Sequence, residues 1–197
     1  MPMSRRTLLR AVAGGGALVG LFCAAACGDG KNGENVATAA PSAGQAGFFG
    51  GTDLAWVEIN IAMNEQLLPL LALAPGKASD ADVKTYASQV DAFSEQELTT
   101  LRQLHDLAKL PSENPHEGMP MPGMVTPEQV AAAKAATGAA FDKLLLQHVR
   151  AHLEQGTSLA KSEEKAGVEP QTLSLAKQVL TNRATALKQL DAMTTAK

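Results

Sequence analysis

Cysteine is nearly absent from the chain. The two cysteines among 197 residues, Cys23 and Cys27, lie near the N-terminus, in a segment that resembles an export signal. Export would remove Cys23 with the signal and leave Cys27 alone, so the mature protein cannot form an internal disulfide. Its stability must therefore come from an apolar core.

Long apolar runs and basic patches are also missing. The apolar stretch at residues 11–22 is too short to cross a bilayer as a helix. The formal net charge of −3, with no cluster of basic residues, argues against nucleic acid as a partner. The single Trp and single Tyr, and the abundance of Ala, Leu, Gln, Glu and Lys, are typical of a helical protein.

Common catalytic motifs are absent as well. The sequence has no glycine-rich phosphate loop, no Gly-x-Ser-x-Gly and no His-Glu-x-x-His. A di-iron centre in a helical bundle needs Glu-x-x-His on its helices. The residues three positions before His105, His148 and His152 are Arg102, Leu145 and Val149. We therefore predict that the protein is not an enzyme.

Residues 1–27 are predicted to be a signal peptide. Arg5-Arg6, with a serine before the pair and a leucine two places after it, fits the twin-arginine export pattern. Cys27 follows three alanines, at the position of the cysteine that is acylated in bacterial lipoproteins. Ala24 stands where leucine is commonest, so cleavage at an Ala-x-Ala site and release of a soluble protein is the alternative. The protein is exported in both cases, and as a lipoprotein it faces the periplasm or the cell exterior.

The mature chain is predicted to have a tether and one domain. Residues 28–51 are rich in Gly, Ala, Asn and Ser and indicate a flexible tether, with Phe48-Phe49 docking at the domain edge. In residues 52–197, apolar side chains recur at three- and four-residue spacing, which predicts helices. Four helices are expected: from Asp53 to Pro75-Gly76, at 79–108, at 126–166 with a bend near Gly138, and from Pro170 onward. Two hairpins of this kind predict an all-α, up-down four-helix bundle.

Capping residues delimit these helices. Ser79 is the expected N-cap of the second helix. Thr126 and Gln129 fit a capping box at the start of the third helix. Asp53 and Asp142 stand near helix starts, where an acid stabilises the helix dipole. Pro75-Gly76 is expected to end the first helix.

The two hairpins resemble each other in sequence. A shift of 89 residues, without a gap, places Asp53 on Asp142. The same shift pairs Glu65 with Glu154, Gln66 with Gln155, Ala87 with Ala176, Gln89 with Gln178, Val90 with Val179, Leu98 with Leu187 and Leu101 with Leu190. We interpret the chain as a duplicated helical hairpin, in which Met63 is the symmetry partner of His152.

The segment from Phe141 to Glu154, together with Met121-Pro122-Gly123-Met124, resembles the bacterial domain-of-unknown-function family 305. Members of that family carry Phe-Asp, an apolar stretch and Met-Ile-x-His-His-Glu, with a Met-Pro-Gly-Met loop between the two hairpins. The resemblance covers residues 53–193. It implies a ferritin-like bundle of duplicated hairpins, export from the cytoplasm and a link to copper. Residues 83–111 resemble, more distantly, domain-of-unknown-function family 4142, which is also exported and ferritin-like.

The chain departs from the family pattern at its metal site. The second histidine of the pair is Leu153 here, and the first hairpin has Met63-Asn64 in place of the pair. The glutamine and glutamate near each hairpin's end survive only as Glu97; the other matching positions hold Ser94, Arg183 and Ala186. The resemblance therefore implies a divergent member whose family metal site is partly lost.

Two groups of residues could bind a metal ion instead. His148 and His152, spaced i, i+4, share one helical face and could hold one ion, with Met63 from the facing hairpin. The alternative is that one histidine is exposed and the other is buried and hydrogen-bonded. His105, near a helix end, is expected to be a surface residue.

The loop at residues 111–126 is the second group. It holds His116, Met119, Met121 and Met124, and thioether and imidazole are ligands that suit copper. The alternative is that Met121 and Met124 are apolar plugs at the end of the bundle.

Two functions remain open from the sequence. The first is a lipid-anchored protein that captures or buffers copper outside the cytoplasm, with membrane attachment through Cys27. The second is a non-catalytic structural or interaction lipoprotein of the cell envelope with a degenerate metal site, with an envelope protein or a second copy of the chain as partner.

Overall fold

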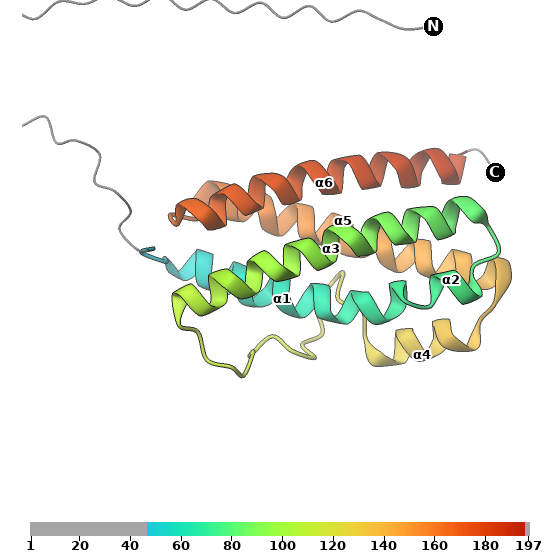
Figure 1. Ribbon diagram of the computed structural model, residues 1–197, viewed down its shortest axis with the longest axis horizontal. Helices are drawn as coiled ribbons and strands as arrows, with labels where there is room; N and C mark the ends of the chain where they lie inside the picture. Colours follow the sequence, from blue (N-terminus) through green and yellow to red (C-terminus); the bar gives the residue numbers. More distant parts are fainter. Residues whose placement is uncertain (1–46, 196–197) are drawn as a thin grey trace, which may run out of the picture. The chain divides into compact units, whose positions relative to one another are not determined.

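Four long helices and two short ones make up the fold. The computed structural model describes residues 47–195, so the predicted signal peptide, Cys27 and most of the predicted tether lie outside the described residues. Within residues 47–195 the regular structure is entirely helical. The helices are α1 (Gly51–Leu71), α2 (Ala74–Lys77), α3 (Ala81–Ala108), α4 (Pro127–Ala135), α5 (Gly138–Ala166) and α6 (Pro170–Thr195) (Figure 1).

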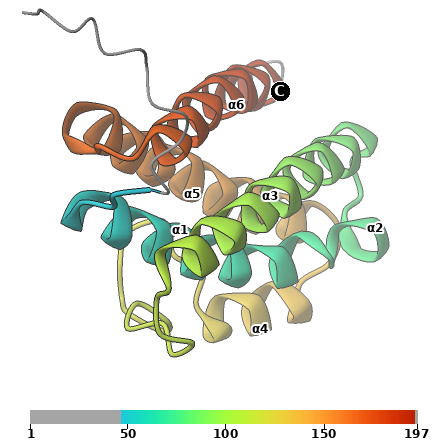
Figure 2. The ribbon, with the colours of Figure 1, turned by 60° about the vertical axis from the view of Figure 1, so that its left-hand side comes forward.

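The long helices form an up-down bundle. α1 packs mainly on α3 and α5 mainly on α6, and these two hairpins meet through α1 with α5 and α3 with α6 (Figures 1 and 2). α2 lies in the connection between α1 and α3, and α4 lies beside the bundle, next to α1. The predicted all-α, ferritin-like four-helix bundle is confirmed. None of the helices in the described part of the chain is long and apolar enough to span a membrane.

Two aspartates show the internal repeat in three dimensions. Asp142 accepts hydrogen bonds from the backbone N–H groups of Ser79–Asp80 at 3.1–3.3 Å, and from the Ser79 hydroxyl at 2.6 Å. Asp53 accepts from the N–H groups of Val168–Glu169 at 3.0 and 3.1 Å. The two aspartates and the two pairs that they bind are related by the same 89-residue shift. Each hairpin therefore caps a helix start in the other hairpin. Asp53 also has the predicted role at the start of its own helix, where it accepts from Gly50 N at 2.7 Å, whereas Asp142 lies beyond the first turn of α5.

Three helix boundaries differ from the prediction. The N-cap of α3 is Asp80, whose Oδ1 accepts from Asp82 N at 2.8 Å, because Asp142 takes the hydroxyl of Ser79. The third helix is broken into α4 and α5 rather than bent, since Gly138 adopts a φ of 62°, which disfavours a side chain. Pro75 lies within α2 instead of ending α1. The capping box of Thr126 with Gln129 is confirmed, with hydrogen bonds of 2.9 and 3.3 Å.

The last residues of the predicted tether already belong to the domain. α1 begins at Gly51, and Phe49 packs on the cluster of buried apolar residues that contains Trp56 and Val57. Phe48 is 79% exposed. The predicted docking therefore holds for Phe49 alone.

Candidate functional site

The long loop between α3 and α4 is fixed on the bundle. Nδ2 of Asn114 donates to the carbonyl of Glu58 on α1 at 2.8 Å. The Gln66 amide, oriented so that both of its groups are satisfied, donates to the Val125 carbonyl and accepts from Gly118 N, each at 3.1 Å. The loop is therefore tied to α1 near both of its ends and is docked on the bundle.

Gly123 allows the same loop to lie close against α5. It has a φ of 80°, and a Cβ at this position would lie 2.5 Å from Cβ of Gln155 and 2.7 Å from the carbonyl oxygen of Ala151. Only glycine allows so close an approach with this backbone conformation. Since the neighbouring Met124 packs with Ala62 and Met63 of α1, the loop lies over the seam between α1 and α5.

Three methionines that we assigned to two separate sites meet at this seam. Met63 of α1 is 1% exposed and Met124 of the loop is 5% exposed. Met121 is partly buried and packs against the cluster that these two form with Ala62. We call Met63, Met121 and Met124 the methionine cluster. Its thioethers come from two segments that the docked loop holds together.

The other predicted ligands do not join the methionine cluster. His116 lies beside Glu58, with Nε2 3.9 Å from a carboxylate oxygen, and Met119 is 40% exposed. His148 is half-buried on α5, and burial lowers its pKa. His105 is in the last turn of α3, where its Nε2 lies 3.0 Å from the carbonyl of Pro111. Among the described residues, no group of three or more His, Cys, Asp or Glu side chains is arranged to hold a metal ion.

His152 belongs to a buried polar centre that we did not predict. Arg183 of α6 forms a bidentate ion pair with Glu97 of α3, with N–O distances of 2.7 and 3.1 Å. Nη2 of Arg183 also lies 3.4 Å from Nε2 of His152. The three side chains are each at most 2% exposed. We call His152, Glu97 and Arg183 the polar centre.

His152 is neutral at neutral pH. Burial and the charge of Arg183 hold the pKa of His152 well below its usual range, and the carbonyl of Gly123 opposes them without prevailing. Because Nε2 accepts from Arg183, the neutral ring carries its proton on Nδ1. The lone pair that a metal ion would need is therefore already used.

A signal for the ion pair was present in the sequence. Arg183 stands on the apolar stripe of α6, four residues after Val179 and seven before Leu190. A charge in such a stripe is buried only with a partner. Glu97 lies in the same way between Val90 and Leu101 on α3.

A buried carboxyl pair lies where α1, α5 and α6 meet. Asp53 and Glu163 are both 0% exposed, and Glu169 is 1% exposed. Burial, a hydrogen bond with Asp53 and the charges of Asp53 and Glu169 raise the pKa of Glu163 to about 8. Glu163 is therefore protonated at neutral pH and shares its proton with Asp53.

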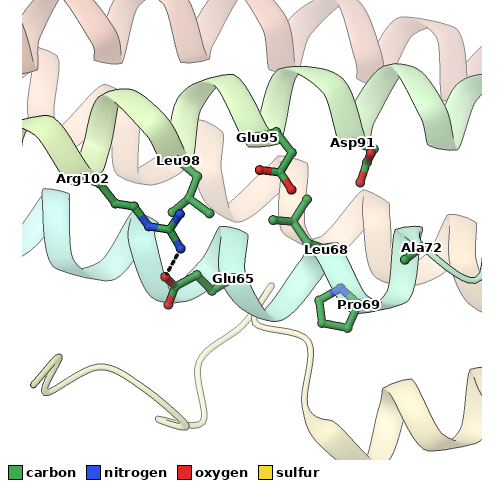
Figure 3. Close-up of a pocket in the computed structure, with 8 residues that line it drawn as sticks. All are labelled: Glu65, Leu68, Pro69, Ala72, Asp91, Glu95, Leu98 and Arg102. Atoms are coloured by element: carbon green, nitrogen blue, oxygen red, sulfur yellow. Dashed lines mark hydrogen bonds and ion pairs between the residues drawn. The ribbon is translucent and has the colours of Figure 1, made fainter.

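A surface groove between α1 and α3 contains none of the predicted ligands. Figure 3 shows that Glu65 and Arg102 point toward each other across it, joined by a 2.8 Å ion pair, with Asp91 and Glu95 farther along α3. The side chains of Arg102 and Glu65 are 58% and 41% exposed. The groove is therefore lined by solvated charges, and we do not assign the site to it.

The family described as Domain of unknown function (DUF305) matches residues 53–194. The chain belongs to this family. The more distant resemblance to family 4142 finds no support, and no curated protein is similar enough in sequence to count as a relative.

Two solved DUF305 structures share the fold of this DUF305 protein. One, from Streptomyces coelicolor and described as secreted, has 17% identity and a TM-score of 0.65, over 72% of this chain and 91% of that one. The other, a fragment from Deinococcus radiodurans, has 13% identity and a TM-score of 0.65, over 74% of this chain and 96% of that one. At these identities the likeness concerns the fold, so function must be argued from the side chains.

Proposed function

We propose that this DUF305 protein is exported, anchored in the membrane through an acylated Cys27, and captures or buffers Cu(I) outside the cytoplasm. The methionine cluster supports the proposal, because the docked loop brings two methionine side chains into one apolar cluster with Met63 of α1. The export signal predicted at residues 1–27 supports the location. So does the description of the Streptomyces coelicolor DUF305 protein as secreted.

The ligand chemistry fits this ion. Thioethers are soft, uncharged ligands that select Cu(I) over harder divalent ions. They also resist oxidation better than a free thiol, which suits a compartment outside the cytoplasm. Met119, two residues before Met121 and 40% exposed, is placed to make the first contact with an arriving ion. His152 is not included as a ligand, because Arg183 already occupies its Nε2.

A Cu(I) competition titration of the mature protein, beginning at Gly28, tests the proposal. We expect binding tighter than micromolar that is lost when Met63, Met121 and Met124 are all changed to leucine, which keeps the bulk and removes the sulfur. Met193→Leu is the matched control, since Met193 packs on a different part of the core. Equal binding by the triple variant would show that the ion is held elsewhere.

A second function is favoured by the polar centre. Because Arg183 and Glu97 fill the middle of the bundle with an ion pair, the protein could serve the envelope as a structural or interaction lipoprotein without any metal. No binding of Cu(I) by the mature protein would support this function. Recovery of one defined envelope partner, unchanged by a chelator, would support it as well. No catalytic role is proposed.

A further inference from the structure

The polar centre has the donor atoms of a metal site but holds a guanidinium group among them. Nη2 of Arg183 lies 2.7 Å from Oε2 of Glu97 and 3.4 Å from Nε2 of His152. A carboxylate oxygen and an imidazole nitrogen are ligands that divalent first-row metal ions accept. The place that an ion would need, between these two atoms, is taken by a nitrogen of Arg183.

The surrounding residues are shaped to hold the guanidinium. A Cβ on residue Gly156 of α5 would lie 2.9 Å from Nε of Arg183, so the absence of a side chain there leaves room for the arginine. The Phe93 ring lies with its centroid 5.1 Å from Cζ of Arg183, within cation–π distance. Arg183 is therefore a built-in part of the core and cannot move aside without losing several contacts.

The charges of the polar centre disfavour a metal ion beside the guanidinium of Arg183. Glu97 and Arg183 together carry no net charge, and His152 is neutral. A divalent ion would have to remove Glu97 and His152 from Arg183, which would leave the arginine buried without a counter-charge. The ion would also meet the positive charge of Arg183 within a few ångströms, where little water screens the repulsion.

We propose that Arg183 is a specificity-determining residue that closes the centre of the bundle to divalent metal ions. Exclusion of divalent ions by Arg183 does not depend on whether the methionine cluster binds Cu(I). Each of the two proposals can therefore be disproved without affecting the other.

Titration of the full mature protein with Co²⁺, followed by its visible absorption, tests the closure. The wild type should bind no Co²⁺ at the centre. Arg183→Gln should gain one bound equivalent of Co²⁺, because the variant removes the buried positive charge that would lie beside the ion. Arg150→Gln is the matched control, because Arg150 is a more exposed arginine paired with Asp191 on the bundle surface. It should behave as the wild type does.

Two further measurements decide the remaining outcomes. The gain in Arg183→Gln should disappear in the double variant with His152→Gln, which places the ion at the centre. In the wild type, paramagnetic Co²⁺ should leave the NMR signals of the His152 ring sharp, a measurement that does not require any variant to fold. Broadening of those signals, or a folded Arg183→Gln protein that binds no Co²⁺, would overturn the proposal.

Discussion

Glu163 makes the stability of the protein depend on pH through a single proton. No described residue donates a hydrogen bond to its buried carboxyl oxygens, so the charged form has nothing to stabilise it. For Asp53, burial alone would raise the pKa, but hydrogen bonds from Glu163 and from backbone N–H groups prevail and lower it. The folded protein therefore keeps a proton on Glu163 at neutral pH, which the unfolded chain releases.

We predict that the free energy of unfolding falls as the pH rises from about 5 to about 8. The contribution of Glu163 is complete below its ordinary pKa of 4.5 and is lost as the pH rises through its folded pKa of about 8. Glu163→Gln keeps a hydrogen-bond donor for Asp53 and cannot lose a proton. Its free energy of unfolding should therefore change less over this pH range, and above about pH 8 it should be higher than that of the wild type. Urea unfolding at several pH values measures this. Glu164→Gln, at the exposed neighbouring position, should follow the wild type, and parallel profiles for wild type and Glu163→Gln would contradict the assignment.

Two glutamate–arginine pairs in this protein differ in burial and should differ in their contribution to stability. Glu97→Gln leaves Arg183 buried without a counter-charge, and we expect it to lower the free energy of unfolding by about 3–5 kcal/mol. Glu65→Gln breaks the exposed pair with Arg102 and should cost less than about 1 kcal/mol. Urea unfolding of both variants at neutral pH gives the comparison. Equal, small costs would mean that the buried pair has little influence on the fold.

At the scale of the elements, local sequence signals were sufficient to locate the helices. Contacts between the hairpins made some helix ends differ from the predicted ones. The Thr126–Gln129 capping box lies within one segment, so the sequence was sufficient to predict it. The N-cap of α3 was predicted one residue early because Asp142, in the other hairpin, takes the hydroxyl of Ser79. The docking of the loop could not be predicted either, since it depends on Gly123 approaching the backbone of α5.

The loop offers a comparison between two glycines with similar backbone conformations. Gly123 and Gly118 have φ values of 80° and 70°, but a side chain at Gly118 would meet nothing within 4 Å. Gly118→Ala should therefore cost only the backbone strain, about 1 kcal/mol. Gly123→Ala adds a collision with Gln155 and Ala151, and we expect it to release the loop from the seam.

Hydrogen exchange measures the release of the loop. In Gly123→Ala the amide of Met124, which donates to the Met121 carbonyl at 3.2 Å, should exchange much faster than in the wild type. In Gly118→Ala it should stay protected. The same release should weaken Cu(I) binding if the methionine cluster is the site. Unchanged protection in Gly123→Ala would show that the loop is held by Gln66 and Asn114 alone.

At the scale of the whole molecule, the helical periodicity was sufficient to predict the bundle, and the repeat related the position of Met63 to that of His152. The identity of the site was harder to predict, because the shift relates positions within the two hairpins but says nothing about the loop between them. Met63 packs with loop methionines, and His152 with Arg183 and Glu97. The symmetric partners therefore have different surroundings, a result of one arginine on α6 and one loop that has no counterpart in the repeat.

Asp53 and Asp142, which we call the interhairpin caps, provide a test of how the two hairpins are joined. Asp142 caps the start of α3 and Asp53 the start of α6, two helix ends that lie at opposite ends of the bundle (Figure 1), and the two acids share no partner. We expect Asp53→Asn and Asp142→Asn each to lower the free energy of unfolding by about 1–3 kcal/mol, since each weakens several charge-assisted hydrogen bonds. Asp82→Asn, in the exposed first turn of α3, should cost less than about 1 kcal/mol.

The double variant then shows whether the hairpins unfold together. Distant sites that share no contacts should add to within about 0.5 kcal/mol, provided that the bundle unfolds as one unit. The urea dependence of the unfolding free energy should then be the same in all variants, because each exposes the same surface. A shallower dependence in the double variant would mean that one hairpin separates before the other unfolds. The interhairpin caps, more than the apolar seam, would then be what joins the two halves.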